Sequence, residues 1–406
     1  MKTPILWFFL LLFFSGCATL FFQPAVWKEP PLVRIAILKN INSVKVSSNT
    51  RFQITDGRRV VSLSTGDCWT FSCDSLGLTI LNERSRRIKD PTLPVRIFAT
   101  EKNGQIIIGN KKYREAIEIR QAKTIPKLLV INELNMEDYL RSVVPAEICP
   151  ITEKEIEAAK AQAIAARTYA LTRLGSHSDE GYDLESTVAD QVYNGAGIEN
   201  PLTDEAVKET RGIFAFFQGQ PIVAYYHSTC GGKTANVEEI WERLPVPYLK
   251  SIDDEKFCLR SPQFQWHREW SREEIQKLID KNLSGLFKFP SEIDMGLLLD
   301  IRILGRSITG RIKLLEIITT NGYFPLYGNK IREFLMKDRK SLPSLFFDLK
   351  VERENGVIER VIIEGRGWGH GVGLCQWGAI GRAEKGRNFR KILKDYYQEI
   401  ELVKKY

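Results

Sequence analysis

The sequence predicts an α+β protein in which antiparallel, β-rich regions surround one central alanine-rich helix. The first observation is a series of short apolar segments, separated by turn signals such as Asp56-Gly57 and Asn103-Gly104. The second is the stretch from Ile156 to Tyr169, which is unusually rich in alanine, an excellent helix former. The third is the return of alternating strands at 297–317 and 347–363. Hairpin turns join neighbouring strands in opposite directions, so antiparallel sheets are expected.

Length and charge limit the class of protein. The chain has 406 residues, enough for one large domain or for about two to three ordinary ones. Its 43% hydrophobic and 27% charged residues are typical of a globular protein and argue against a disordered or multi-spanning one. The net charge of +8 suits a polyanion such as an anionic lipid or a carboxylate-bearing glycan, although a solvated basic surface explains it equally well. The chain has no zinc-finger spacing and no aromatic RNA-binding block, so nucleic acid is not an expected partner.

The first seventeen residues predict the compartment. A short positive end precedes a continuous apolar run from Ile5 to Phe14, which is the pattern of a secretory signal and is short for a permanent membrane span. The Ser-Gly-Cys that follows resembles a bacterial lipobox, with phenylalanine where leucine is more usual. We therefore expect residues 1–17 to be a lipoprotein signal peptide, Cys17 to carry the lipid anchor and residues 18–31 to be a tether. An ordinary cleaved signal or an uncleaved anchor is the alternative. The protein is expected outside the cytoplasm, held at a membrane.

Residues 32–125 are expected to form an N-terminal β-rich region. Its apolar or alternating segments are short and bounded by turns, and no pattern in it indicates chemistry. The predicted strands are 33–38, 43–46, 51–54, 60–63, 95–99, 105–109 and 116–119.

A constrained turn holds the main candidate for a catalytic acid. Val143 and Val144 suggest an extended apolar run, and a turn is expected at Pro145. Pro150 disfavours helical angles at the residue before it, so Glu147 is expected on a loop and not within a helix. An acid in this place suits catalysis, but it could also simply favour the dipole of the helix that follows.

Regular elements surround this turn within the expected core domain, residues 126–245. Thr152 and Glu155 match a capping box at the start of the alanine-rich helix. The other elements predicted for this domain are a strand at 128–134, a short helix from 136, and hairpin strands at 213–216 and 221–226.

Residues 246–406 are expected to form a C-terminal α+β part. Ser271 and Glu274 match a second capping box, at the start of an amphipathic helix that reaches Lys281. The loop from Gly365 to Gly373 is dense in glycine, which lets the backbone approach a ligand or another chain closely. A last helix is expected at about 388–397.

Four separated blocks of sequence occur in a recognisable order. They are VVPAE followed by EAAKAQAIAARTYAL between 143 and 171, DQVYNG at 190–195, TRGIFAFFQGQPIVAYYHSTCGGKT at 210–234 and GRGWGHGVGLCQWGA at 365–379. Together they resemble the SpoIID/LytB family (stage II sporulation protein D, also called amidase enhancer). The resemblance extends from about Val33 to the C-terminus, and it implies a SpoIID-like fold.

The resemblance also implies an activity and a catalytic residue. The family includes lytic transglycosylases, which cut the peptidoglycan glycan between N-acetylmuramic acid and N-acetylglucosamine, and the glutamate of the VVP-x-E block is the acid there. Glu147 occupies that position. One carboxyl group suffices because the sugar's own C6 hydroxyl attacks C1, whereas ordinary glycosidases need two carboxyls. The acid must begin protonated, so apolar neighbours are expected to raise its pKa.

Six further residues are candidates for contact with the substrate. Arg167, in the family's KAQ-x-x-AART-Y pattern, either lies beside Glu147 or a buried carboxylate, or anchors the helix structurally. Trp368 could stack on a sugar ring and His370 could hydrogen-bond an acetamido or hydroxyl group, or this loop could pack against the alanine-rich helix. Gln191 and Tyr193, from DQVYNG, are expected on the wall of the cleft. The predicted substrate-binding set is Arg167, Tyr169, Gln191, Tyr193, Trp368 and His370.

Zinc is an optional ligand, and the lytic chemistry requires no cofactor. His227 and Cys230 form a His-x-x-Cys pair compatible with zinc ligation, and the resemblance implies zinc near the active cleft in some members. Cys258 and His370 are the further ligand candidates. A Cys230–Cys258 disulfide and a hydrogen-bonded histidine are the alternatives, because the expected compartment permits disulfides. Cys375 is expected to be a small buried filler.

One functional hypothesis and two alternatives follow. We expect an extracytoplasmic, membrane-anchored lytic transglycosylase, with Glu147 as acid and then base, that prefers glycan strands already stripped of stem peptides. It would serve remodelling, division or sporulation. The first alternative is a non-catalytic glycan-binding enhancer of an N-acetylmuramoyl-L-alanine amidase, and the second is a zinc hydrolase at His227 and Cys230. The expected partners are peptidoglycan strands, the membrane and, for the enhancer, an amidase.

Overall fold

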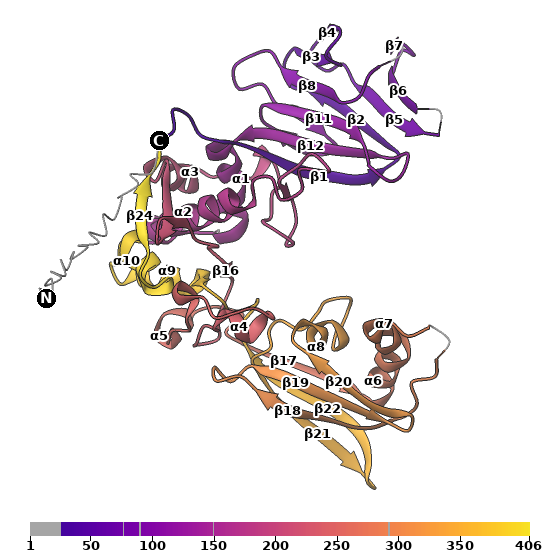
Figure 1. Ribbon diagram of the computed structural model, residues 1–406, viewed down its shortest axis with the longest axis vertical. Coiled ribbons are helices and arrows are strands. Elements are labelled where there is room, and N and C mark those ends of the chain that lie inside the picture. Colours follow the sequence, from indigo (N-terminus) through magenta and orange to yellow (C-terminus); the bar gives the residue numbers. More distant parts are fainter. Residues whose placement is uncertain (1–25, 76, 89–90, 149, 291–292) are drawn as a thin grey trace, which may run out of the picture.

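The computed structural model describes residues 26–75, 77–88, 91–148, 150–290 and 293–406. A pair of N-terminal sheets, a helical middle and a second α+β unit follow one another along the long axis (Figure 1). Most strand pairs are antiparallel, which confirms the predicted α+β class. The predicted signal peptide and Cys17 lie outside the described residues. Within the described part of the chain, no helix is both long and apolar enough to cross a bilayer.

Two sheets form the N-terminal region. Their strands alternate between buried and more exposed residues, as in β3, where Phe52 and Ile54 are buried. The seven-stranded sheet has the order β13 (Leu184–Glu185), β1 (Leu32–Ile41), β12 (Leu128–Asn135), β11 (Ala116–Gln121), β8 (Val95–Ala99), β3 (Phe52–Thr55) and β4 (Val60–Leu63). The six-stranded sheet has the order β10 (Lys111–Tyr113), β9 (Ile106–Ile108), β2 (Ser43–Ser48), β5 (Trp69–Asp74), β6 (Gly77–Asn82) and β7 (Arg87–Ile88).

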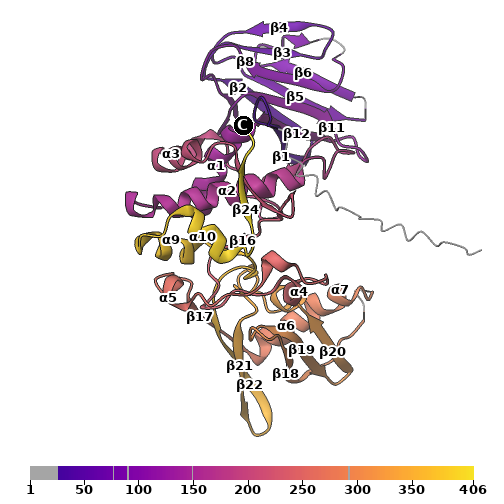
Figure 2. The same cartoon turned by 60° about the vertical axis from the view of Figure 1, so that its left-hand side comes forward.

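The alanine-rich segment is the buried centre of the helical middle. It forms α2 (Ile156–Arg173), and all seven of its alanines are fully buried. Side chains this small let neighbouring elements pack closely around it, and the yellow C-terminal helices lie along it in both views (Figure 2). Its neighbours are α1 (Met136–Ile148), α3 (Pro201–Glu209), α9 (Gln376–Glu384), α10 (Phe389–Tyr396) and β14 (Ile213–Phe217). The capping box is present, since the Glu155 carboxylate accepts the Thr152 N–H at 2.6 Å.

Helix α1 corrects one prediction. It continues through Val143, Val144 and Pro145, so Glu147 lies in its last turn and not on a loop. Both valines and the proline are buried, and this packing outweighs the local preference for a turn. Proline removes only one donor from the helical ladder when it sits this close to the C-terminal end.

The second α+β unit has its own hydrophobic core, which residues from 266 to 363 form. One of its sheets has the order β17 (Gln265–Ser271), β22 (Val357–Arg366), β21 (Phe347–Glu354), and the other has β18 (Leu298–Arg306), β19 (Ile312–Thr319), β20 (Gly322–Tyr327). Its helices are α6 (Arg272–Leu278), α7 (Ser284–Phe287) and α8 (Asn329–Phe334), and the predicted capping box of Ser271 and Glu274 is present at α6.

The end of the chain returns from this unit to the helical middle. Two short sheets make the return, β16 with β23 in parallel and β15-β14-β24. Residues 372–400 therefore belong to the first core and not to the second. The glycine-rich loop, residues 365–373, lies where the chain passes from the second core back to the first. The elements concerned are β15 (Gln220–Pro221), β16 (Tyr226–His227), β23 (Leu374–Cys375), β24 (Glu401–Lys404), α4 (Val237–Ile240) and α5 (Glu255–Cys258).

Candidate active site around Glu147

Three donors hold the Glu147 carboxyl group. The Val192 N–H lies 3.3 Å and the Tyr226 hydroxyl 3.4 Å from Oε1, and Gln376 Nε2 lies 3.1 Å from Oε2. Burial raises the pKa of Glu147 above its usual range, and these three hydrogen bonds partly oppose that shift. The side chain is only partly exposed. The site therefore favours the neutral acid, yet it has donors ready for the carboxylate that forms when the proton leaves.

A buried chain of hydrogen bonds orients one of these donors. The Tyr139 hydroxyl donates to Gln191 Oε1 at 2.9 Å, and Gln191 Nε2 donates to the Tyr226 hydroxyl at 2.8 Å and to the Ala166 carbonyl at 3.3 Å. Because the Tyr226 oxygen already accepts from Gln191, its own hydrogen is directed to Glu147. Gln191 is 1% exposed, so it positions Tyr226 and does not form the predicted cleft wall.

Glu147 lies in a cleft of about 670 Å³ between the two cores. Trp368, which is 38% exposed, and His370 line one part of it. The second α+β unit contributes the opposite part, with a basic segment at 339–343. The residues that line the cleft are Glu147, Val188, Asp190, Val192, Tyr226, His227, Ser228, Arg332, Arg339, Lys340, Ser341, Leu342, Pro343, Trp368, Gly369, His370 and Gln376.

Two neutral histidines lie side by side in this cleft, with ring centroids 5.4 Å apart. Burial lowers the pKa of His370 to about 4, and that of His227 falls well below its usual range for the same reason. His227 Nδ1 lies 3.1 Å from the Val372 carbonyl and must carry the hydrogen, so its Nε2 is an acceptor. That Nε2 is buried and has no hydrogen-bond partner among the described residues.

Two other predicted contact residues are buried in the interior. Arg167 is fully buried and forms a bidentate pair with Glu137, at 2.9 and 2.8 Å. The prediction of substrate contact is therefore wrong for Arg167. The side chain lies beside a buried carboxylate, that of Glu137 and not of Glu147, and it links α2 to α1. Tyr193 is 2% exposed, and its hydroxyl donates to Asn132 at 2.6 Å, so it too belongs to the core.

Tyr169 borders a smaller pocket that adjoins the main cleft. Its hydroxyl donates to Asp190 Oδ1 at 3.2 Å and accepts from Arg173. This pocket, of about 250 Å³, shares Asp190, Tyr226 and His370 with the cleft of Glu147. Tyr169 thus lies near enough to line an extended binding groove.

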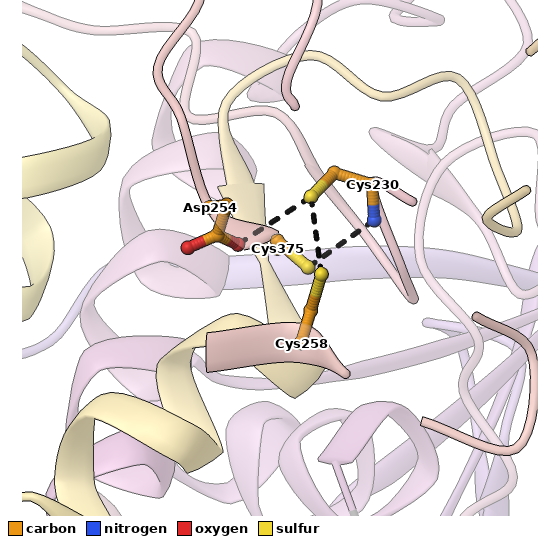
Figure 3. A group of neighbouring side chains, drawn as sticks. All are labelled: Cys230, Asp254, Cys258 and Cys375. Atoms are coloured by element: carbon orange, nitrogen blue, oxygen red, sulfur yellow. Dashed lines mark hydrogen bonds between the residues drawn. The ribbon is translucent and has the colours of Figure 1, made fainter. Parts of the chain in front are cut away.

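The side chains around Cys230 differ from the expected zinc ligands. Cys230 lies with Asp254, Cys258 and Cys375, and the four ligand atoms are all within 4.8 Å of one another (Figure 3). His227 is not part of this group, because its ring faces His370 and Val372 instead. All four residues are buried, so a catalytic metal with a position open to substrate does not fit them, and the zinc-hydrolase alternative loses its site. The cysteines are free thiols in the structure, as are Cys68 and Cys73.

Three residues of the site were missed in the sequence. Tyr226 and Gln376 contact Glu147 directly, and both lie inside blocks that carried the resemblance, which is the one signal that could have identified them. Arg339 comes from outside every block, and no pattern indicated that its segment reaches the cleft.

Comparison with known proteins finds a family model and several relatives that match this chain. A family model described as Stage II sporulation protein (SpoIID) matches residues 125–217, which include Glu147, and a domain of unknown function (DUF8618) matches residues 259–373, the second α+β unit. The chain is 33% identical to an uncharacterised protein of Brachyspira hyodysenteriae over 68% of each chain. It is 31% identical to Stage II sporulation protein D of Bacillus subtilis, over 67% of this chain and 75% of that protein. It is 28% identical to the Amidase enhancer of Bacillus subtilis, but covers only 39% of that protein.

Proposed function

The chain belongs to the SpoIID/LytB family, and from that premise we propose that it is a peptidoglycan lytic transglycosylase with Glu147 as its acid and base. The observation that carries the proposal is a partly exposed glutamate of raised pKa that faces a cleft and is held by three donors. A relative is named for stage II of sporulation, and a cell-wall role in sporulation or division suits this chain as well. The proposed site of action is outside the cytoplasm, with the protein held by a lipid on Cys17.

The proposed reaction needs one carboxyl group and no water. Glu147 gives its proton to the glycosidic oxygen as the C1–O bond breaks, and the new carboxylate is stabilised by its three donors. The C6 hydroxyl of the same muramyl residue then forms a bond to C1, and its proton returns to Glu147. The products are a 1,6-anhydro end and a strand with a free hydroxyl, so atoms and charges balance.

Asp190 is the other carboxylate that lines this cleft among the described residues. Its oxygens accept the Tyr169 hydroxyl and the Glu185 N–H, at 3.2 and 2.9 Å, and it forms an ion pair with Arg173. A carboxylate that is occupied in this way is a poor nucleophile or base for a second, hydrolytic step. This favours the lytic route over ordinary glycoside hydrolysis.

The basic segment opposite Glu147 supports a preference for peptide-stripped strands. Removal of a stem peptide by an amidase leaves a free lactyl carboxylate on each muramyl residue, and a carboxylate is attracted to cations. Arg339 and Lys340 form no ion pair with another described residue, so their charges are available to the strand. Arg332 donates to the carbonyls of Leu342 and Pro343, at 2.7 and 3.2 Å, and thereby holds this segment in place.

Mass analysis of products tests the proposal. Purified protein without residues 1–17 is incubated with peptide-free glycan strands, and 1,6-anhydro-muramyl ends are expected for the wild type and not for Glu147→Gln. Release of such ends at the wild-type rate by the variant would remove Glu147 from the mechanism.

The second candidate is a non-catalytic enhancer of an amidase, which the name of one relative favours. It predicts that neither protein releases anhydro ends, but that both raise the rate at which an amidase strips the same strands.

A further inference from the structure

Three sulfur atoms and one carboxylate converge in the interior from three distant segments (Figure 3). Cys230 follows β16, Asp254 and Cys258 bracket the one-turn helix α5, and Cys375 ends β23 as the N-cap of α9. Each of these four residues is at most 1% exposed. Burying polar groups costs free energy unless hydrogen bonds or a bound ion compensate for the lost water.

The spacing of these atoms fits the ligands of one tetrahedral metal ion. Cys230 Sγ lies 3.5 Å from Cys258 Sγ and 3.4 Å from Asp254 Oδ2. A zinc ion with bonds of about 2.3 Å to sulfur places two tetrahedral sulfur ligands about 3.8 Å apart. A disulfide instead needs about 2.05 Å between sulfurs, and it would leave the third thiol unpaired.

Backbone N–H groups around the sulfurs are arranged for thiolates. The N–H groups of Cys230 and Gly378 each lie 3.3 Å from Cys375 Sγ. A cation deprotonates the thiols that coordinate it, and these N–H groups would then face a thiolate.

The carboxylate has outer partners of the kind that orient a metal ligand. Asp254 forms a buried ion pair with Arg382, and the Tyr396 hydroxyl donates to its Oδ2 at 2.8 Å. Gly378 makes room for it, since a Cβ atom there would lie 2.0 Å from Asp254 Oδ2. The positive charge of Arg382 also offsets part of the negative charge of three thiolates and a carboxylate.

We propose that Cys230, Cys258, Cys375 and Asp254 bind one zinc ion as a closed structural site. Soft thiolate ligands in a tetrahedral set suit zinc, and four protein ligands leave no position for water. The ion joins three segments, adding to the pairing of β16 with β23 and to the contact of α5 with α9. One of them continues directly from Cys375 into Gln376, the donor to Glu147, so the ion also fixes that amide beside the acid. Zinc binding itself is independent of the proposed function, whereas this positioning role rests on it.

Metal content and a spectroscopic count of thiolates test the site. The wild type, purified without chelator, is expected to contain one zinc per chain by plasma mass spectrometry. After zinc removal, titration with cadmium is expected to give a sulfur-to-metal charge-transfer band with the intensity of three thiolates at one equivalent. This second measurement needs no variant, so it holds even if the substituted proteins fail to fold.

Matched variants identify the ligands. Cys258→Ser and Cys375→Ser are each expected to weaken zinc binding by at least about tenfold. Cys73→Ser removes a thiol that is also buried, at 5% exposed, but lies in the N-terminal sheets, and this variant should keep one zinc. The proposal is overturned if the wild type has neither zinc nor a thiolate band, if peptide mapping finds a Cys230–Cys258 disulfide in zinc-free native protein, or if both serine variants retain zinc with wild-type affinity. Bound zinc in a protein that releases no anhydro ends would remove the proposed function and leave the metal site standing.

Discussion

Replacing Arg167 with methionine is predicted to lower the free energy of unfolding by about 3–5 kcal/mol, the usual cost of removing one partner of a buried ion pair. Arg167 is fully buried on α2, and both oxygens of Glu137 accept from it, at 2.9 and 2.8 Å. It also donates to the carbonyls of Val207 and Ile213, each at 3.3 Å, so one side chain joins α1, α3 and β14 to α2. The substitution leaves the Glu137 carboxylate buried without its counter-charge.

Urea denaturation followed by circular dichroism measures this effect, and two comparisons make it specific. Arg173→Met is the control on the same helix, because its side chain is 37% exposed and its pair with Asp190 is expected to contribute only about 0–1 kcal/mol. Adding Glu137→Gln to Arg167→Met removes the stranded charge and should recover about 0.5–3 kcal/mol. An Arg167→Met protein with wild-type stability but a raised KM for glycan strands would refute this reasoning and restore Arg167 to the substrate site.

Three further predictions concern the cleft and the cysteine cluster. Gln376→Leu removes a donor to the Glu147 carboxylate and therefore raises the pKa of Glu147 further. The alkaline limb of the pH–rate profile should move to higher pH. A limb that stays in place or moves to lower pH would contradict the assigned hydrogen bond. Arg339→Glu should raise KM for peptide-free strands several-fold at low salt and much less at high salt. Lys281→Glu makes the same charge change on an exposed residue outside the cleft and should leave KM unchanged. Equal effects of the two variants on KM would show that only net charge matters. Gly378→Ala should destabilise the protein by about 1–3 kcal/mol and reduce its zinc content, because the new Cβ would lie 2.0 Å from Asp254 Oδ2. Normal zinc content in this variant would count against Asp254 as a ligand.

The pH dependence of stability gives a separate test of the Glu147 environment. Its pKa is raised in the folded protein, so the stability that its neutral form contributes is complete below the unfolded pKa and is lost as pH rises through the folded one. Glu147→Gln should therefore be more stable than the wild type at pH values above the folded pKa and gain nothing at acid pH. Parallel stability profiles for the two proteins, measured by thermal unfolding across pH, would contradict a raised pKa.

Local patterns in the sequence predicted the regular elements well. Alternation predicted most strands of the seven-stranded sheet, but only β2 and β9 of the six-stranded one, where β5, β6, β7 and β10 were missed. Alanine content with a capping box predicted α2. The same local rules failed at Glu147, where proline effects suggested a loop but burial of Val143 and Val144 keeps the chain helical. Propensity acts through neighbours in the chain, and tertiary packing decided the outcome.

The site was harder to predict from the sequence than the regular elements, because its residues are distant in the chain. Gln376 is 229 residues from Glu147, and Cys375 is 145 residues from Cys230, so no spacing rule connects them. The resemblance identified Glu147 and the loop of Trp368 and His370, because its blocks include them. It could not tell that Arg167 and Tyr193 face the interior. The burial of Arg167 depends on how α2 packs, and that of Tyr193 on its contacts with Asn132 of β12 and Tyr139 of α1.

The origin of the oxygen atom at the cut end tests the central claim most directly. Wild-type protein is incubated with peptide-free strands in water enriched in heavy oxygen, and new muramyl ends are examined by mass spectrometry. If Glu147 lets the sugar close on its own C6 hydroxyl, every new end is a 1,6-anhydro ring without heavy oxygen, and Glu147→Gln produces none. Heavy oxygen at C1 of the new ends would show that water attacks, and the single-acid mechanism would then be wrong.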